Sequence, residues 1–158
     1  MKTCDHPNLS VVTVPNFPYE LKGVGKFTIT KARVVKCEDC NATLLLGEEV
    51  EKWHKEIEEA LSKASDSLKP GAIVFLRKRL RLDQAAFANV LGVDQSTVSR
   101  WESGATKISP TAENFLKVLV AMEPTERKTF IQSRLHPTES NSFRRVLQDT
   151  PLVRAGNR

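Results

Sequence analysis

The chain lacks long apolar runs and has little cysteine. No segment approaches the ~20 consecutive apolar residues that a membrane-spanning helix needs. The opening stretch, MKTCDHPNLS, has no apolar core of the kind found in secretion signals. We therefore expect a cytoplasmic protein without a membrane partner. In that compartment its three cysteines are expected to be free thiols or metal ligands rather than disulfides.

Patterns typical of enzymes are also missing. His54 lies on an otherwise charged face of a predicted helix and His136 precedes a proline, and neither has partners at the spacing of a catalytic triad. A zinc deaminase would carry H-x-E upstream of P-C-x-x-C, and the segments TCDHP and KCEDC do not fit that motif. We find no internal repeat. We expect a binding protein and not an enzyme.

The positive charge of the chain is concentrated near its C-terminus. The 158 residues fit one domain or two small ones, with a net charge of +5. Residues 127–158 hold seven Arg/Lys and two Asp/Glu, whereas the rest of the chain holds 17 of each sign. A second cluster, RKRLR, occupies 77–81. Basic patches favour nucleic acid through phosphate contacts, although a solubilising surface has the same composition.

The N-terminal part reads as a small sheet followed by one helix. Alternation and β-branched residues predict strands over 11–14, 19–22 and 26–37, and GVG at 23–25 is typical of a hairpin turn. Residues 47–67 predict an amphipathic helix with an acidic outer face. Its apolar stripe consists of Val50, Trp53, Ile57, Leu61 and Ala64.

The rest of the chain has no strand signal. SDSLKPG at 65–71 is a plausible linker, and residues 71–134 read as a series of short helices. Beyond residue 135 the chain is basic, with two prolines and few apolar residues. We expect a flexible arm there, with one short helix around Phe143–Leu147.

Two short helices across a tight turn are predicted in the middle of the chain. Asp83 and Asp94 are placed to cap them. Gly92 permits the turn because glycine tolerates a positive φ, and Gly104 ends the second helix. These helices and the one before them span 71–79, 84–91 and 95–102. This is the helix-turn-helix pattern. The inward positions are Ile73, Leu76, Leu80, Phe87, Ala88, Leu91, Val93, Val98 and Trp101.

The outward face of the third helix is polar. It consists of Gln95, Ser96, Thr97, Ser99 and Arg100. Such a helix fits the major groove of DNA, where Arg can bond to guanine and Gln to adenine, each worth ~1–3 kcal/mol of discrimination. Ser99 has the alternative of simply facing solvent. We expect Trp53 and Trp101 to be core residues and not nucleic-acid stackers.

The segment LRLDQAAFANVLGVDQSTVSRWESG, 80–104, resembles the helix-turn-helix domains of the phage-repressor (Xre/Cro) family. The resemblance implies that Gln84 contacts the DNA backbone and a base, that Gln95, Ser96 and Arg100 contact bases, and that Glu102 is structural. Lys107, in the following loop, would touch phosphate. Arg81 stands where the family usually has glycine, and we expect it to add a phosphate contact or a surface charge without disturbing the fold. Such domains usually act as dimers on palindromes, with half-sites ~10 base pairs apart.

The cysteines suggest a metal site. CEDC at 37–40 is a C-x2-C knuckle after a strand, and Cys4 and His6 are the upstream candidates for a second ligand pair. A tetrahedral zinc site from Cys4, His6, Cys37 and Cys40 would help a region with few large apolar residues to fold. Two alternatives remain: a frayed Cys4 with no metal, and a redox C-x2-C.

The order of ligand pair, PNFPYELKG, strands, VVKCEDC, acidic helix, linker and Cro-like domain resembles the MqsA-type antitoxins, which carry a YgiT-type zinc finger. The resemblance spans about residues 1–122. It implies structural zinc held by two C-x2-C pairs, an N-terminal domain that grips an mRNA-cleaving toxin, and a C-terminal domain that dimerises and represses the operon. Pro7 stands in the place of the second cysteine, which puts zinc in doubt or moves one ligand to His6.

These observations predict an α+β protein: a small β-rich, zinc-finger-like domain over 1–67, an all-α Cro-like helix-turn-helix domain over 68–134, and a basic arm over 135–158. The expected function is sequence-specific regulation of transcription on double-stranded DNA as a homodimer. Its alternatives are an antitoxin that neutralises a toxin through its N-terminal domain and a protein-interaction module without DNA binding.

Overall fold

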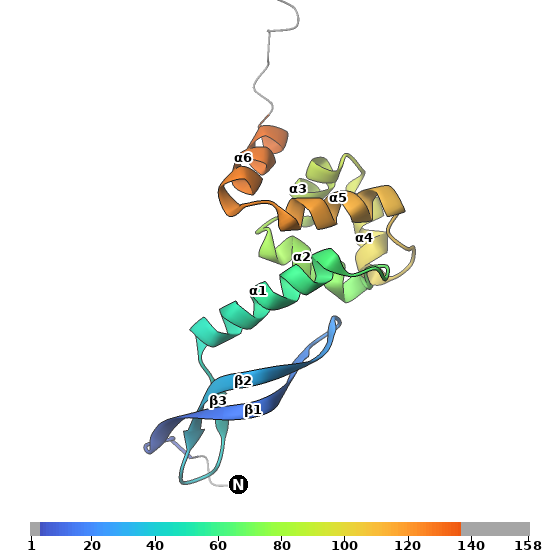
Figure 1. Ribbon diagram of the computed structural model, residues 1–158. Coiled ribbons are helices and arrows are strands. Elements are labelled where there is room, and N and C mark those ends of the chain that lie inside the picture. The colour runs from blue at the N-terminus through green and yellow to red at the C-terminus, as the bar shows by residue number, and fades with distance from the viewer. Residues whose placement is uncertain (1–3, 137–158) are drawn as a thin grey trace, which may run out of the picture.

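The computed structural model describes residues 4–136, which form an α+β fold with a three-stranded antiparallel sheet followed by six helices (Figure 1). The expected arm, with its helix around Phe143–Leu147, lies outside the described residues except for its first two. None of the described helices is long and apolar enough to cross a bilayer. The elements are β1 (Leu9–Leu21), β2 (Gly25–Cys37), β3 (Thr43–Leu45), α1 (Gly47–Lys63), α2 (Pro70–Arg79), α3 (Gln84–Leu91), α4 (Gln95–Ser103), α5 (Pro110–Ala121) and α6 (Pro124–Leu135).

A long hairpin dominates the sheet. β1 pairs with β2 from Leu9↔Cys37 to Leu21↔Gly25, so the segments expected at 11–14 and 19–22 belong to one continuous strand. β3 pairs with the far end of β2. Alternate side chains of the hairpin face α1, as expected of a sheet with one covered face. There Ala32 and Val34 are fully buried against Trp53.

Helix α1 has the predicted apolar stripe, with Trp53 and Ile57 buried. It ends at Lys63 and not at residue 67, because Ala64 adopts an extended backbone. The chain beyond is held by Lys117 of α5, whose Nζ donates to the carbonyl of Ala64 at 2.8 Å. Tertiary contacts thus end this helix earlier than its pattern indicates.

The stretch expected as a linker is fixed to α5. The backbone N–H of Leu68 donates to Glu113 Oε1 at 3.1 Å, and Ser67 Oγ donates to Glu113 Oε2 at 2.8 Å. Burial would raise the pKa of Glu113, but hydrogen bonds from Lys117, Ser67 and Leu68 lower it below its ordinary value. Leu68 itself is buried in the main core. This stretch is therefore part of the packed structure.

The turn residues of the helical half mostly follow the sequence prediction. Asp83 caps α3 by accepting from Ala86 N at 2.7 Å, and Gly92 and Gly104 adopt left-handed φ values of 69° and 78°. Asp94 precedes α4 as expected, but its side chain makes no capping hydrogen bond. That part of the prediction is wrong: the main-chain carbonyl of Asp94, and not its carboxylate, accepts from the first turn.

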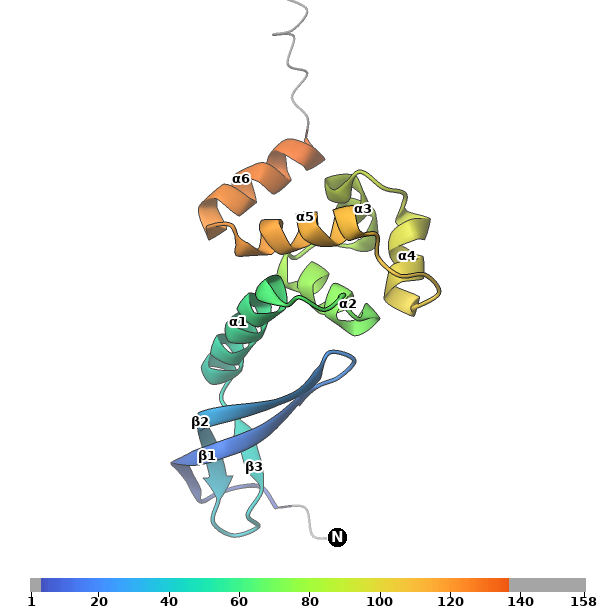
Figure 2. The same cartoon turned by 45° about the vertical axis from the view of Figure 1, so that its right-hand side comes forward.

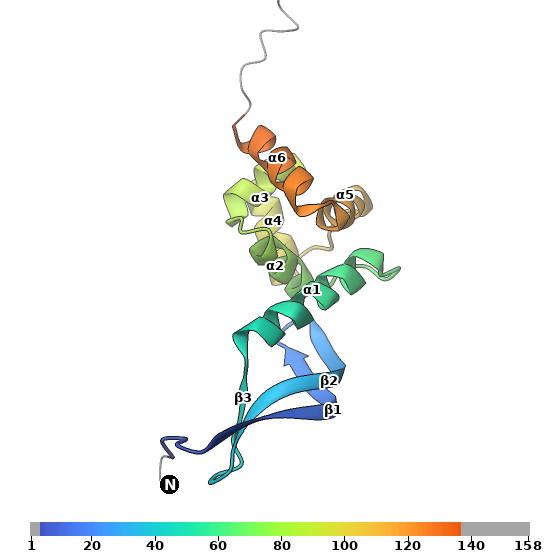
Figure 3. The same ribbon diagram turned by 60° about the vertical axis from the view of Figure 1, so that its left-hand side comes forward.

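One apolar core joins the helices to the N-terminal part. Val98 and Trp101 are buried as predicted. Ile57 of α1 belongs to the same cluster, and Tyr19 and Phe27 of the hairpin pack against it. Figures 1 to 3 show α1 between the sheet and the other helices in every view. The expected boundary near residue 67 stays a prediction, and apolar packing continues across it.

The hairpin turn touches the start of α2. A Cβ added at Gly71 would lie 1.9 Å from the carbonyl oxygen of Gly23 and 2.6 Å from its Cα. Gly23 has φ +79°, a left-handed conformation that favours glycine. Only a residue without a side chain fits at position 71. The contact brings the tip of the sheet against the helical half.

Gly71→Ala is expected to destabilise the protein by about 1–3 kcal/mol, because the new methyl group would push the hairpin turn away from α2. Urea denaturation measures this change. The control is Gly47→Ala at the start of α1, where an added Cβ meets nothing within 4 Å and stability should be unchanged or slightly higher. Equal stability of Gly71→Ala and wild type would contradict the close approach.

Candidate metal centre and nucleic-acid interface

The structure brings the four predicted metal-ligand candidates together. Cys37 ends β2, Cys40 lies in the turn after it, and Cys4 and His6 precede β1. Their ligand atoms all lie within 4.8 Å of one another. Cys4 Sγ is 3.8 Å from Cys37 Sγ, and Cys40 Sγ is 3.4 Å from Nδ1 of His6. Cys4 is thus placed against the knuckle.

Main-chain hydrogen bonds shape this cluster. Asn41 N donates to the Cys37 carbonyl at 2.8 Å, which closes the knuckle, and Glu38 N donates to the carbonyl of Asn8 at 3.0 Å. The second bond fixes the segment before β1 to the knuckle. His6 and Asn41 both have positive φ, 53° and 56°. The backbone therefore adopts a left-handed conformation on both sides of the cluster.

The electrostatics of the cluster favour a thiolate. A hydrogen bond from His6, helped by the backbone of Cys40 and Asp39 and opposed by burial, lowers the pKa of Cys37 to about 6. Cys4 differs: the backbone of His6 lowers its pKa, but burial and the neighbouring thiols raise it above its ordinary value overall. Because the thiolate is the form that binds metal, Cys37 is ready to act as a ligand at neutral pH.

The donor set and its spacing fit a tetrahedral ion. Three thiols and one imidazole are a common structural zinc set, with Zn–S near 2.3 Å and Zn–N near 2.0–2.1 Å. Tetrahedral angles then place sulfurs about 3.8 Å apart and sulfur and nitrogen about 3.5 Å apart. The Cys4–Cys37 and Cys40–His6 distances are 3.8 and 3.4 Å. The cluster can therefore bind a metal ion.

A second candidate surface lies on α4. The helix buries Val98 and Trp101, and its Glu102 is paired with Arg77 inside the protein. The positions expected to read DNA are exposed or half-buried: Gln95, Ser96, Thr97, Ser99 and Arg100. Lys107 follows in an exposed loop. The polar residues of the short helix thus form one accessible face.

Gln84 is only partly available to an outside partner. Its side-chain amide donates to Glu102 Oε2 at 2.8 Å, and Arg77 pairs with the same carboxylate at 2.6 Å. Burial raises the pKa of Glu102, but hydrogen bonds from Arg77 and Gln84 outweigh it, and the pKa lies below its ordinary value. Glu102 is structural, as the family resemblance implied. It fixes the side chain of Gln84 at the start of α3.

The structure also shows contacts that the sequence did not suggest. In the basic cluster 77–81, Arg77 is paired with Glu102, and Arg79 is paired with Glu58 at 3.1 Å. The cluster is therefore partly internal and not simply a nucleic-acid patch. His54, which the sequence places on a charged helix face, is half-buried, and its Nε2 lies 2.7 Å from the hydroxyl of Tyr19. Its i+4 spacing from Val50 could have indicated burial.

The family model described as the antitoxin component of the bacterial toxin-antitoxin system, MqsA, matches residues 1–124. The chain belongs to the MqsA antitoxin family. The match covers the sheet, the cysteine–histidine cluster and the helices up to the start of α6. No curated protein matches the chain. The resemblance inferred from the order of ligand pairs, strands and helices is thereby confirmed.

The cluster makes a testable prediction about metal content. Purified protein should contain about one tightly bound transition-metal ion per chain. His6→Ala should lose it, because the fourth ligand is removed. Pro7→Ala is the matched control and should keep it, since Pro7 offers no ligand atom. Elemental analysis of both variants measures this, and equal metal content in the two would exclude His6 as a ligand.

Proposed function

We propose that the chain is a sequence-specific DNA-binding transcriptional regulator of the antitoxin type. It acts in the cytoplasm as a homodimer on a palindromic operator and has no catalytic role. The observation that carries the proposal is the exposed polar face of α4, held by a buried apolar face and by the glycine-containing turns at both of its ends. A helix so presented matches the recognition helix of helix-turn-helix proteins.

Base reading is assigned to the start and middle of α4. Gln95 and Ser96 lie in its first turn, which enters the major groove first in this class of domain. Arg100 lies further along and is exposed, so its guanidinium can form two parallel bonds to a guanine. Thr97 and Ser99 are shorter and would add single hydrogen bonds to bases or phosphates.

Backbone contacts are assigned to the flanks. Gln84 stands at the first position of α3 with its amide fixed by Glu102, an arrangement that supports a contact with a phosphate or base edge. Lys107, in the loop after α4, would neutralise a phosphate and release a counterion. These contacts would set the register of the protein on DNA, and the α4 contacts would select the sequence.

The metal cluster is proposed as a structural zinc site held by Cys4, His6, Cys37 and Cys40. The second apolar cluster of the protein is small, with Ala32, Val34 and Trp53 as its buried members. A sheet with so little core gains from a cross-link at its end. The four ligands would tie the segment before β1 to the knuckle after β2. Zinc bound there would stabilise the folded state and would take no part in a reaction.

A second function has its own support. The sheet exposes Leu9 and Val11 on β1, with 51% and 59% of their surface accessible, and Leu44 and Leu45 on β3. Exposed apolar side chains of this kind favour a protein partner. An antitoxin would use the N-terminal half to neutralise an mRNA-cleaving toxin while α4 represses the operon. A neighbouring reading frame for a small ribonuclease would distinguish it from a stand-alone regulator.

Arg100→Ala tests base reading. On an operator selected from random DNA with the wild-type protein, affinity should fall by ~1–3 kcal/mol, and one base position should lose its preference. Ser103→Ala, at the other end of α4, is the control and should bind normally. Unchanged affinity and selectivity of Arg100→Ala would refute the assignment and favour the interaction-module alternative.

Lys107→Ala tests phosphate contact. Because phosphates carry no sequence information, the variant should bind all DNA sequences more weakly by a similar factor, and the slope of log K against log salt should fall by about 1. Anisotropy titrations at several salt concentrations measure both. Lys63→Ala, at another exposed lysine on α1, should leave the slope unchanged. A sequence-dependent loss would instead place Lys107 at a base.

A further inference from the structure

A basic pocket lies in the helical half, apart from α4. It has a volume of about 560 Å³ between the end of α2, the turn into α3 and one side of α6. Its cationic lining residues are Arg79, Arg81, Arg127 and Lys128, and no carboxylate is among the lining residues. Leu82 and Ile131, both buried, contribute apolar surface. Cationic side chains around an apolar surface suit an organic anion.

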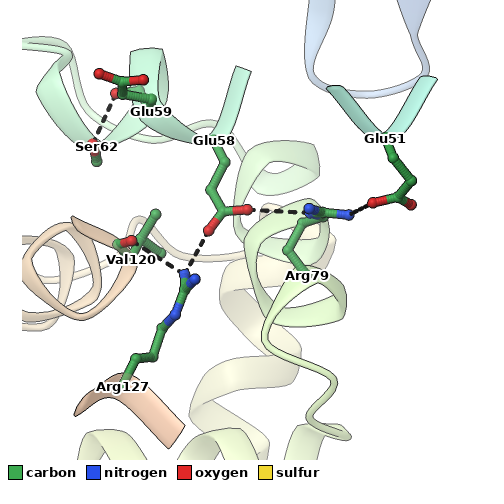
Figure 4. A network of polar contacts seen from close by, with 7 residues as sticks. All are labelled: Glu51, Glu58, Glu59, Ser62, Arg79, Val120 and Arg127. Atoms are coloured by element: carbon green, nitrogen blue, oxygen red, sulfur yellow. Dashed lines mark hydrogen bonds and ion pairs between the residues drawn. The ribbon is translucent and has the colours of Figure 1, made fainter. Parts of the chain in front are cut away.

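Two of the guanidinium groups are held in place by one carboxylate (Figure 4). Glu58 of α1 is buried, and it accepts from Arg79 Nε at 3.1 Å and from Arg127 Nη1 at 2.5 Å. Glu51 accepts from Arg79 Nη1 at 2.7 Å. Within the described chain these bonds leave the Nη2 groups of both arginines free to donate. Side chains fixed in this way lose little entropy when they bind an anion.

The positive charge of the pocket is not fully neutralised. Glu51 and Glu58 balance Arg79 and Arg127, which leaves Arg81 and Lys128, both exposed, without a carboxylate partner among the described residues. Arg81 also has φ +58°. A left-handed conformation is strained for arginine and unstrained for glycine. The chain thus keeps a cationic side chain at the pocket where glycine would suit the backbone better.

The pocket is separate from the proposed base-reading face. Figures 1 and 2 show α4 and α6 on opposite sides of the helical half, with α3 and α5 between them. The pocket lies on the α6 side, away from the base-reading residues of α4, and its edge at the turn into α3 is near Gln84 in sequence. Its volume lies in the range typical of small-molecule sites. The planar guanidinium group of arginine can form two parallel hydrogen bonds with phosphate oxygens.

We propose that this pocket binds a small organic phosphate. Arg79 and Arg127, positioned by Glu58, would hold the phosphate oxygens from one side, and Arg81 and Lys128 would close on them from the solvent side. Leu82 and Ile131 would contact the apolar part of the ligand. Because Glu58 belongs to α1, a ligand there would contact side chains fixed by both the N-terminal part and the helical half.

The test titrates full-length protein with pyrophosphate and with ADP, by calorimetry and by amide chemical shifts. We expect saturable binding of both, with shifts at residues of the pocket and tighter binding of ADP, because ADP adds apolar contact. The Arg81→Gly variant should bind both probes about tenfold more weakly. It should unfold at the same or a higher temperature, since the substitution relieves backbone strain. Lys128→Ala should weaken binding without changing stability.

Control variants and competitors make the test decisive. Lys26→Ala, on the exposed surface of the hairpin, should bind both probes like the wild type. Equal affinity of wild type and Arg81→Gly, or shifts confined to α4, would overturn the proposal. Displacement of ADP by a glutamate-rich peptide that binds more tightly would also overturn it and assign the pocket to an acidic protein partner. No DNA is used, so failure here leaves the proposed DNA-binding function untouched.

Discussion

The packing of α1 on two sides is the constraint on which the rest of the structure depends. Trp53 lies against the sheet, with its ring 5.2 Å from that of Tyr19, and Ile57 lies one turn later in the core of the helices. One helix therefore completes two apolar clusters that would otherwise be open to water. Removing it would expose both, since neither the sheet nor helices α2 to α6 offer another cover for that surface.

Buried carboxylates fix how the parts meet. Glu58 joins α1 to α2 and α6, and Glu113 joins the 64–69 stretch to α5. Burying a carboxylate is costly unless its oxygens accept hydrogen bonds. The carboxylates of Glu58 and Glu113 each accept at least two. Such pairs add little net stability, but they disfavour alternative arrangements in which a charge would be left without a partner. They select one orientation of the halves.

Local patterns made much of this architecture predictable. The alternation in the hairpin, the stripe of α1 and the caps around Gly92 each depend on neighbours in sequence, and the four ligand candidates follow from residue chemistry and spacing. The missed contacts depend on distant residues. Nothing near Glu113 or Glu58 in sequence indicates which arginine or backbone N–H will meet it, and nothing near Asp94 shows that its carboxylate will turn away from α4.

The length of the hairpin has a consequence for anything bound at its far end. β1 and β2 each contain 13 residues, and at about 3.3 Å per residue such strands extend roughly 40 Å. The turn of this rod is packed against α2, while the cysteine–histidine cluster lies at the opposite end. A partner held there would keep a fixed distance and direction from α4. In a dimer on DNA, the fold would fix the positions of two such partners. A flexible linker would instead let each partner occupy a range of positions.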